Sequence, residues 1–265
     1  MNAAEGPVLV DYRQDGHVAV VTLNRPQVMN AINTEMGHAL DRVFLELADQ
    51  PRVRVVVLTG AGDRAFCAGG DLKERGPMTP DDWVRQHRVF ESAHRRVRQL
   101  PKPIFAAVNG VAAGGGLELA LSTDFIIASE HARFGQPEVK RGIMPGGGGT
   151  QLLPRFLPRG FALELLMTGR LISAEEALRW GLVNSLHPQE KLMPDAEELA
   201  AHIAANSPGA VQQAKKSARM GLEQPIEQAI AIELECYQRM VDHPDRYEGV
   251  AAFNEGREPS FADVL

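Results

Sequence analysis

Apolar runs of strand length alternate with stretches of helical periodicity through roughly the first half of this chain, and this alternation limits the possible folds more than any other feature. Val18 to Leu23 and Val53 to Leu58 are runs rich in β-branched residues. Between them, apolar residues recur at helical spacing after Asn33, a residue suited to capping a helix. The pattern predicts an α/β architecture with largely buried strands. Strand signals nearly vanish beyond Gly149, so we expect an all-helical C-terminal third.

Local signals set the expected bounds of individual elements. Asp15-Gly16 lies between two apolar runs and predicts a β-hairpin. Thr79 with Asp82, and Ser173 with Glu176, have the spacing of capping boxes and predict the starts of two helices. Further expected elements are strands at Pro103 to Val108 and Asp124 to Ala128, a short helix near Gly115 to Ser122, and helices at Ser207 to Gly221 and Pro225 to Asp242.

The bulk composition is that of a globular protein with no electrostatic reason to bind nucleic acid. The chain has 265 residues, 44% of them hydrophobic, which is enough for a sizeable core. Its net charge of −6 argues against nucleic acid and anionic membranes as partners. Cys67 and Cys236 have no metal-site spacing, and the sequence shows neither a secretory signal nor eighteen contiguous apolar residues. We therefore expect a cytoplasmic protein with reduced thiols and no metal.

Two glutamates within glycine-containing motifs carry the strongest chemical signal. Glu118 follows Gly114-Gly115-Gly116, and Glu138 follows Phe134-Gly135-Gln136-Pro137. A third glycine cluster, Gly69-Gly70, lies upstream. Carboxylates can move protons, while glycine leaves backbone N–H groups uncovered, so that they can bind a developing negative charge. The combination predicts acid/base chemistry beside an oxyanion hole.

Five motifs occur in one order along most of the chain: Asn24-Arg25-Pro26 with Asn30-Ala31, Ala65 to Leu72, Ala107 to Glu118, Phe134 to Glu138, and Gly142 to Gln151. Together they resemble the crotonase (enoyl-CoA hydratase/isomerase) family. The resemblance implies a ClpP/crotonase spiral of β-β-α repeats over residues 1–200. It also implies a helical region over residues 201–265 that mediates assembly into a homotrimer or a dimer of trimers.

The same resemblance implies roles for individual residues. The backbone N–H groups of Gly70 and Gly115 would bind the thioester oxygen of an acyl-CoA substrate, with no separate cofactor. Glu118 would be the base toward a water that adds at C3, and Glu138 the acid that protonates C2, with Gly146 helping to hold the water. Carboxylates that share one water should have pKa values that are pushed apart. Suggested substrate or CoA contacts are Ala68, Arg25, Arg64, Arg257, Asp71 and Leu72; Asp71 is also a candidate helix cap.

Alternatives to a hydratase remain at this point. Retention of both glutamates makes hydration the leading hypothesis and Δ3,Δ2-enoyl isomerisation the second. A non-catalytic RNA-binding or assembly role is disfavoured by the excess of acidic residues. Gly60 to Ala65 fits the dinucleotide fingerprint G-x-G-x-x-A, but the following Phe66 to Gly70 is a poor helix start. The acyl group cannot be deduced, although Leu72 to Thr79 and the helix from Asp82 are expected to wall its pocket.

Overall fold

Six strands form the larger of two sheets in the computed structural model, which describes residues 6–263. Its strand order is β1-β2-β3-β5-β7-β10, in which β1 pairs antiparallel with β2 and the other neighbours pair in parallel. The bounds are Val8–Arg13 for β1, Val18–Leu23 for β2, Val55–Gly60 for β3, Ile104–Val108 for β5, Phe125–Ser129 for β7 and Ser185–His187 for β10. All residues of β3 and β5 are buried, as expected for strands that helices cover on both faces.

Four three-residue strands form the second sheet, in the order β4-β6-β8-β9. They are β4 (Ala65–Cys67), β6 (Val111–Ala113), β8 (Arg133–Gly135) and β9 (Leu171–Ser173). Strands β4, β6 and β8 are parallel neighbours. Each comes directly after a strand of the large sheet, namely β3, β5 and β7, and each is followed by helix. This repeated step from large sheet to small sheet to helix is the spiral of β-β-α units that the family resemblance implied.

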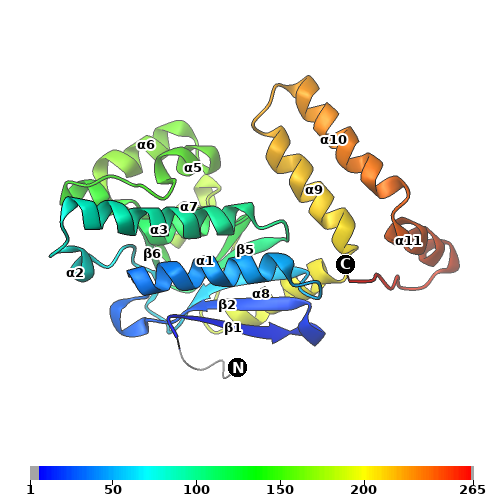
Figure 1. Ribbon diagram of the computed structural model, residues 1–265, viewed down its shortest axis with the longest axis horizontal. Coiled ribbons are helices and arrows are strands. Elements are labelled where there is room, and N and C mark those ends of the chain that lie inside the picture. Colours follow the sequence, from blue (N-terminus) through cyan, green and yellow to red (C-terminus); the bar gives the residue numbers. More distant parts are fainter. Residues whose placement is uncertain (1–5, 264–265) are drawn as a thin grey trace.

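Two long helices, α1 (Thr34–Asp49) and α3 (Pro80–Gln99), lie side by side against the sheets (Figure 1). The Asn33 side chain accepts a hydrogen bond from the Met36 amide at 3.0 Å, which confirms the predicted cap of α1. Thr79 and Asp82 form the predicted capping box of α3. The inward face of α1 is apolar and buried, and each large side chain there stabilises the fold by roughly 1.5–3 kcal/mol. These side chains are Met36, Leu40, Phe44 and Leu47.

The remaining helices are α2 (Leu72–Arg75), α4 (Gly115–Leu121), α5 (Gly149–Phe156), α6 (Arg159–Thr168), α7 (Ala174–Trp180), α8 (Leu192–Ala204), α9 (Pro208–Gly221), α10 (Ile226–Val241) and α11 (Pro244–Glu255). Helix α8 packs its alanine-rich face on one side of the large sheet. Helices α9 to α11 extend away from the sheets, and the chain after α11 returns toward α8 (Figure 1). We refer to residues 208–255 as the C-terminal arm. Within residues 6–263, no helix is both long and apolar enough to cross a membrane.

The expectation of an all-helical C-terminal third is wrong at one strand. Strand β10 lies in that third and extends the large sheet beside β7. Side chains hold it in place: Ser185 Oγ lies 2.8 Å from His187 Nε2, and His187 Nδ1 lies 2.6 Å from Asp195 Oδ2 in α8. A strand of this length has too few residues to show a period-two pattern, so its stability depends on such contacts. The dinucleotide fingerprint at Gly60 to Ala65 leads into β4 rather than into the helix it requires.

Candidate active site

The three predicted motifs meet at one edge of the small sheet. Gly70 follows β4, Gly114-Gly115 follows β6, and Gln136 to Glu138 follows β8. Because these strands are parallel neighbours, the residues after their carboxyl ends lie at the same edge. Polar groups that are far apart in the sequence are thereby brought together on loops held by a rigid scaffold, where binding sites commonly form.

The backbone amides of Gly70 and Gly115 are close to each other. A methyl group placed on Gly115 would lie 3.7 Å from the Gly70 nitrogen, and one on Gly69 would lie 3.3 Å from the Gly115 nitrogen. No acceptor among residues 6–263 is hydrogen-bonded to either amide. Gly115 also opens helix α4, where the first N–H groups lack helical partners and the helix dipole favours negative charge. The pair therefore has the character of an anion-binding site.

Glu118 is a buried carboxylate held by backbone amides. Its Oε1 accepts hydrogen bonds from the amides of Gly147 and Gly149, both at 2.7 Å. Its Oε2 lies on the side of Gly115, since a methyl group on that glycine would be 3.9 Å from it. Only 3% of Glu118 is exposed, so these two amides replace the water that would otherwise solvate the charge. One oxygen is fixed by these amides, and the other lies between Gly147 and Gly115.

Glu138 lies on the other side of the same glycine turn, in the 3-10 segment η3 (Pro137–Arg141). A methyl group on Gly114 would lie 2.8 Å from its Oε1. Burial raises the pKa of Glu138 from 4.5 to about 7, and the nearby charge of Glu118 also raises it. With a pKa of about 7, Glu138 is able to exchange a proton near neutral pH.

Gln136 was not among the residues predicted from the sequence, although it lies within the motif that ends at Glu138. Its side chain is fully buried. With its NH₂ group facing Glu138, it donates to Oε1 at 3.0 Å and to Oε2 at 3.1 Å. The sequence signal that could have indicated Gln136 is its position two residues before Glu138 in the same motif. Gln136 holds the Glu138 carboxyl group in a fixed orientation.

Helix α3 places two histidines against the same region. His94 Nε2 lies 3.0 Å from the carbonyl oxygen of Gly115, and its Nδ1 lies 2.7 Å from that of Phe90. His94 is buried, and its contacts to two carbonyl groups give it a packing role. The ring of His87 touches Gly146, because a methyl group on that glycine would be 2.6 Å from Cε1. Gly147 and Gly149, rather than Gly146, bind Glu118 directly, so the water-holding role of Gly146 stays a prediction.

Several residues that were suggested as CoA contacts form hydrogen bonds or ion pairs with other residues of the protein. Arg25 donates to the Ala31 carbonyl at 2.5 Å and pairs with Asp71 at 3.0 Å. Asp71 accepts from the amides of Lys73 and Glu74, which confirms its predicted role as the cap of α2. Arg257 pairs with Glu248 and Glu255 on the C-terminal arm. Ala68 and Leu72 flank Gly70 along the chain, and Leu72 is 44% exposed, while Arg64 lies exposed before β4. All these CoA contacts stay predictions.

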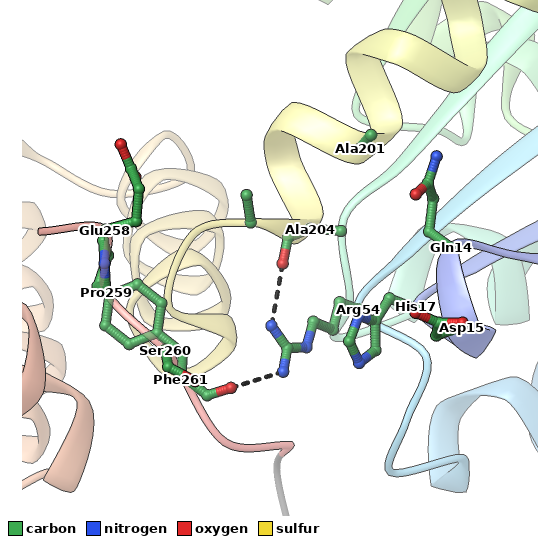
Figure 2. Close-up of a pocket in the computed structure, with 11 residues that line it drawn as sticks. Gln14, Asp15, His17, Arg54, Ala201, Ala204, Glu258, Pro259, Ser260 and Phe261 are labelled. Carbon is green, nitrogen blue, oxygen red and sulfur yellow. Dashed lines mark hydrogen bonds between the residues drawn. The ribbon is translucent and has the colours of Figure 1, made fainter.

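A cavity of about 440 Å³ lies elsewhere in the molecule and is lined by none of the predicted site residues (Figure 2). The buried Arg54 is at its centre. Arg54 donates to the Ala204 carbonyl at 3.1 Å and to the Phe261 carbonyl at 2.8 Å, and it also pairs with Asp263. The Arg54 guanidinium therefore links the start of β3 to the end of α8 and to the C-terminal segment. The contacts of Arg54 give this cavity a structural role, so the two glutamates remain the candidate site.

Known proteins resemble this chain along most of its length. A family model described as enoyl-CoA hydratase/isomerase matches residues 13–264. The short-chain-enoyl-CoA hydratase of Clostridium acetobutylicum is 42% identical over 92% of this chain and 94% of its own length. The (E)-benzylidenesuccinyl-CoA hydratase of Thauera aromatica is 42% identical over 92% and 95%, respectively. A crystal structure of enoyl-CoA hydratase from Bacillus anthracis superimposes with a TM-score of 0.94 at 40% identity, covering 96% of this chain and 98% of that one.

Proposed function

The chain belongs to the enoyl-CoA hydratase/isomerase family, and from this premise we propose that it adds water reversibly across the 2,3 double bond of a 2-enoyl-CoA thioester. The single observation that carries the proposal is the placement of two glutamates on either side of one glycine turn. Glu118 lies beside Gly115 and Glu138 beside Gly114. A site with one fixed carboxylate and one carboxyl group that titrates near neutrality suits the addition and removal of water.

The proposed reaction begins with polarisation of the thioester. The amides of Gly70 and Gly115 donate to the carbonyl oxygen, and these bonds strengthen as negative charge develops on it. Electron density withdrawn toward this oxygen makes C3 electrophilic. Loss of one such donor typically costs about 3 kcal/mol of transition-state stabilisation. The two amides therefore supply a large share of the rate enhancement without any additional cofactor.

The two carboxyl groups then divide the proton transfers. Glu118 takes a proton from the water while the oxygen of this water bonds to C3. Glu138 then gives a proton to C2 of the enolate-like state. In the proposed syn addition, the hydroxyl group and the proton reach the same face of the double bond. In the reverse direction, Glu138 removes the C2 proton and Glu118 returns a proton to the departing hydroxyl group. The pKa of about 7 for Glu138 fits this exchange.

Δ3,Δ2-enoyl isomerisation is the second candidate. It requires one carboxyl group that takes a proton from one carbon and returns it to another, and a group with a pKa near 7 is suited to both steps. Retention of two acidic groups favours hydration, since isomerisation adds no water that would need a second one. A non-catalytic RNA-binding role is the distant alternative. It would show as salt-sensitive RNA binding without turnover of any acyl-CoA.

We further propose that the protein works as a homotrimer or a dimer of trimers, assembled through residues 201–265. Large apolar side chains on and beside the C-terminal arm are strongly exposed in the single chain, which supports this proposal. They include Leu222 at 86%, Ile226 at 70%, Tyr237 at 68% and Phe253 at 86%. Light scattering during gel filtration would measure the assembly, and a monomer would contradict it.

Turnover of crotonyl-CoA in D₂O tests the proposed reaction. A hydratase forms 3-hydroxybutyryl-CoA with deuterium at C2, whereas an isomerase introduces deuterium at C4 and adds no hydroxyl group. We expect the first pattern, read by proton NMR. A panel of 2-enoyl-CoA and 3-hydroxyacyl-CoA esters would then establish the preferred acyl group. Exchange at C4 without hydration would exclude the leading proposal and favour the second.

A further inference from the structure

A guanidinium group lies directly beside the proposed oxyanion hole. Arg75 is the last residue of α2, and its Cζ and Nη1 would both be 3.6 Å from a methyl group placed on Gly70. Arg75 is half-buried, and the Glu118 carboxylate is close enough to act on its charge. A permanent positive charge is thus part of the wall of the site.

Contacts with α3 fix the orientation of this side chain. Arg75 Nε donates to Gln86 Oε1 at 2.6 Å. The guanidinium carbon lies 4.3 Å from the centre of the Trp83 ring and 5.0 Å from that of Phe90. Gln86 is itself buried, and its amide donates to Thr34 at 2.8 Å and to Glu74 at 2.6 Å. A guanidinium held in this way loses little conformational freedom when it binds a ligand.

No ion pair among residues 6–263 neutralises the charge of Arg75, although Glu74 and Glu118 lie near enough to act on it. No carboxylate oxygen of residues 6–263 forms an ion pair with it, and none of their acceptors is bonded to its terminal Nη1 or Nη2. The two nearest acids each accept hydrogen bonds from other groups on one oxygen: Glu74 Oε2 accepts from the Thr34 amide and from Gln86, and Glu118 Oε1 accepts from two glycine amides. Half-burial removes part of the water that would solvate this guanidinium, so the arrangement favours an anionic ligand.

From this arrangement we propose that the preferred acyl group carries a carboxylate beyond C3, bound in a two-pronged manner by the Nη1 and Nη2 groups of Arg75. This inference rests on the proposed function, because it assumes that the thioester oxygen is held at Gly70. The guanidinium touches Gly70, so only a few bonds separate the thioester from the carboxylate. The substrate is therefore the 2-enoyl-CoA of a short dicarboxylic acid. Arginine and carboxylate match in geometry, and such pairs are among the strongest hydrogen-bonded contacts in proteins.

Saturated acyl-CoA esters measure this recognition separately from the chemistry, because they cannot be hydrated. We expect calorimetry to show that glutaryl-CoA binds at least about tenfold more tightly than butyryl-CoA. The Arg75→Gln substitution should abolish this preference by weakening glutaryl-CoA about tenfold or more, with butyryl-CoA changed less than about threefold. Arg75→Lys keeps the charge without the planar fork and should give an intermediate preference. Arg85→Gln is the matched control, since Arg85 is an exposed arginine on α3 that pairs with Asp82.

Kinetics with glutaconyl-CoA and crotonyl-CoA complete the test. We expect wild-type hydration of glutaconyl-CoA to exceed that of crotonyl-CoA in kcat/KM, and Arg75→Gln to reverse the order. Equal binding of glutaryl-CoA and butyryl-CoA by the wild type overturns the carboxylate site. Equal losses on both substrates in Arg75→Gln also overturn it, because they would assign Arg75 to the support of the enolate. If neither substrate is hydrated while glutaryl-CoA is still preferred, the proposed hydration fails and the carboxylate site stands.

Discussion

The two glutamates differ in how the protein stabilises their charge. Glu118 receives two backbone amides on one oxygen, at 2.7 Å each. Glu138 is buried beside it, and burial raises the pKa of Glu138 to about 7. The two amides hold the Glu118 carboxyl group in one orientation, while burial favours the protonated form of Glu138 and hence an acid. The roles proposed for the two residues follow from these environments.

The pH dependence of hydration should therefore report on Glu138. Hydration needs Glu138 protonated, so kcat/KM should be level below about pH 7 and fall toward tenfold per pH unit above it. Dehydration needs the ionised form and should fall below about pH 7. Initial rates with crotonyl-CoA and with 3-hydroxybutyryl-CoA at a series of pH values would measure both pH dependences. A hydration rate that is unchanged between pH 6 and 9 would contradict the acid role.

The free energy of unfolding should also depend on pH through the titration of Glu138. The folded-state pKa of Glu138 lies above its unfolded value of 4.5, so the folded state binds this proton more tightly. The resulting stabilisation is fully present below about pH 4.5 and is lost as the pH rises through about 7. The Tm of Glu138→Gln relative to the wild type should thus increase from pH 5 to pH 8. Substitution of the exposed Glu46 by Gln provides the control, and a pH-independent difference would count against the assignment.

The sequence motifs identified the candidate catalytic residues, but they did not predict how the surrounding side chains are arranged. Glu118, Glu138, Gly70 and Gly115 were all predicted, and the structure brings them together; their catalytic roles stay predictions. The orientation of Arg75 was not predictable, because it depends on Trp83 and Gln86 from a separate helix. The pairing of Arg25 with Asp71, 46 residues away, was likewise hidden from the sequence.

At the scale of elements, capping signals were reliable and short strands were not. The predicted helix starts at Asn33, Thr79 and Ser173 all appear with their side-chain caps. In contrast, none of the four strands of the small sheet was predicted. Each is three residues long, so its existence depends on pairing with neighbours that are distant in the sequence. This small sheet nevertheless positions the site.

The contact between α4 and β4 should tolerate no added atom. A methyl group on Gly116 would lie 2.0 Å from the carbonyl oxygen of Cys67, and backbone cannot move away as a flexible side chain can. Gly116→Ala should therefore lower the free energy of unfolding by about 3 kcal/mol or more. Denaturant unfolding followed by circular dichroism would measure the loss.

Gly160 offers a matched control at the second position of another helix. No heavy atom lies within 4 Å of a methyl group placed there, and the residue belongs to α6. Gly160→Ala should stabilise the protein by roughly 0.5–1 kcal/mol, since alanine loses less backbone entropy than glycine in a helix. Similar effects of the two substitutions would show that α4 and β4 are not closely packed.

At the scale of the whole molecule, the C-terminal segment is anchored to the sheets at one junction. Arg54 binds the Ala204 and Phe261 carbonyl groups, and Asp263 pairs with both Arg54 and His17. Removal of the guanidinium leaves these buried acceptors unsatisfied. Arg54→Ala should cost about 1–3 kcal/mol and release the segment after α11 to proteases.

Arg52 provides the control for this experiment. It is exposed and donates only to the Asp15 carbonyl among residues 6–263. Arg52→Ala should leave both Tm and the pattern of limited proteolysis nearly unchanged. If Arg54→Ala behaves in the same way, the C-terminal segment is held by other contacts.

The central claim is that Glu118 and Glu138 act together on one water beside the Gly70 and Gly115 amides. The most direct test is kcat for hydration of crotonyl-CoA by Glu118→Gln, Glu138→Gln and the double variant, each with circular dichroism matching the wild type. Each single substitution should lower kcat by about 10²–10⁴, and the double variant should be scarcely slower than the worse single one, since either loss disables the unit. Near-normal kcat in either single variant would contradict the claim.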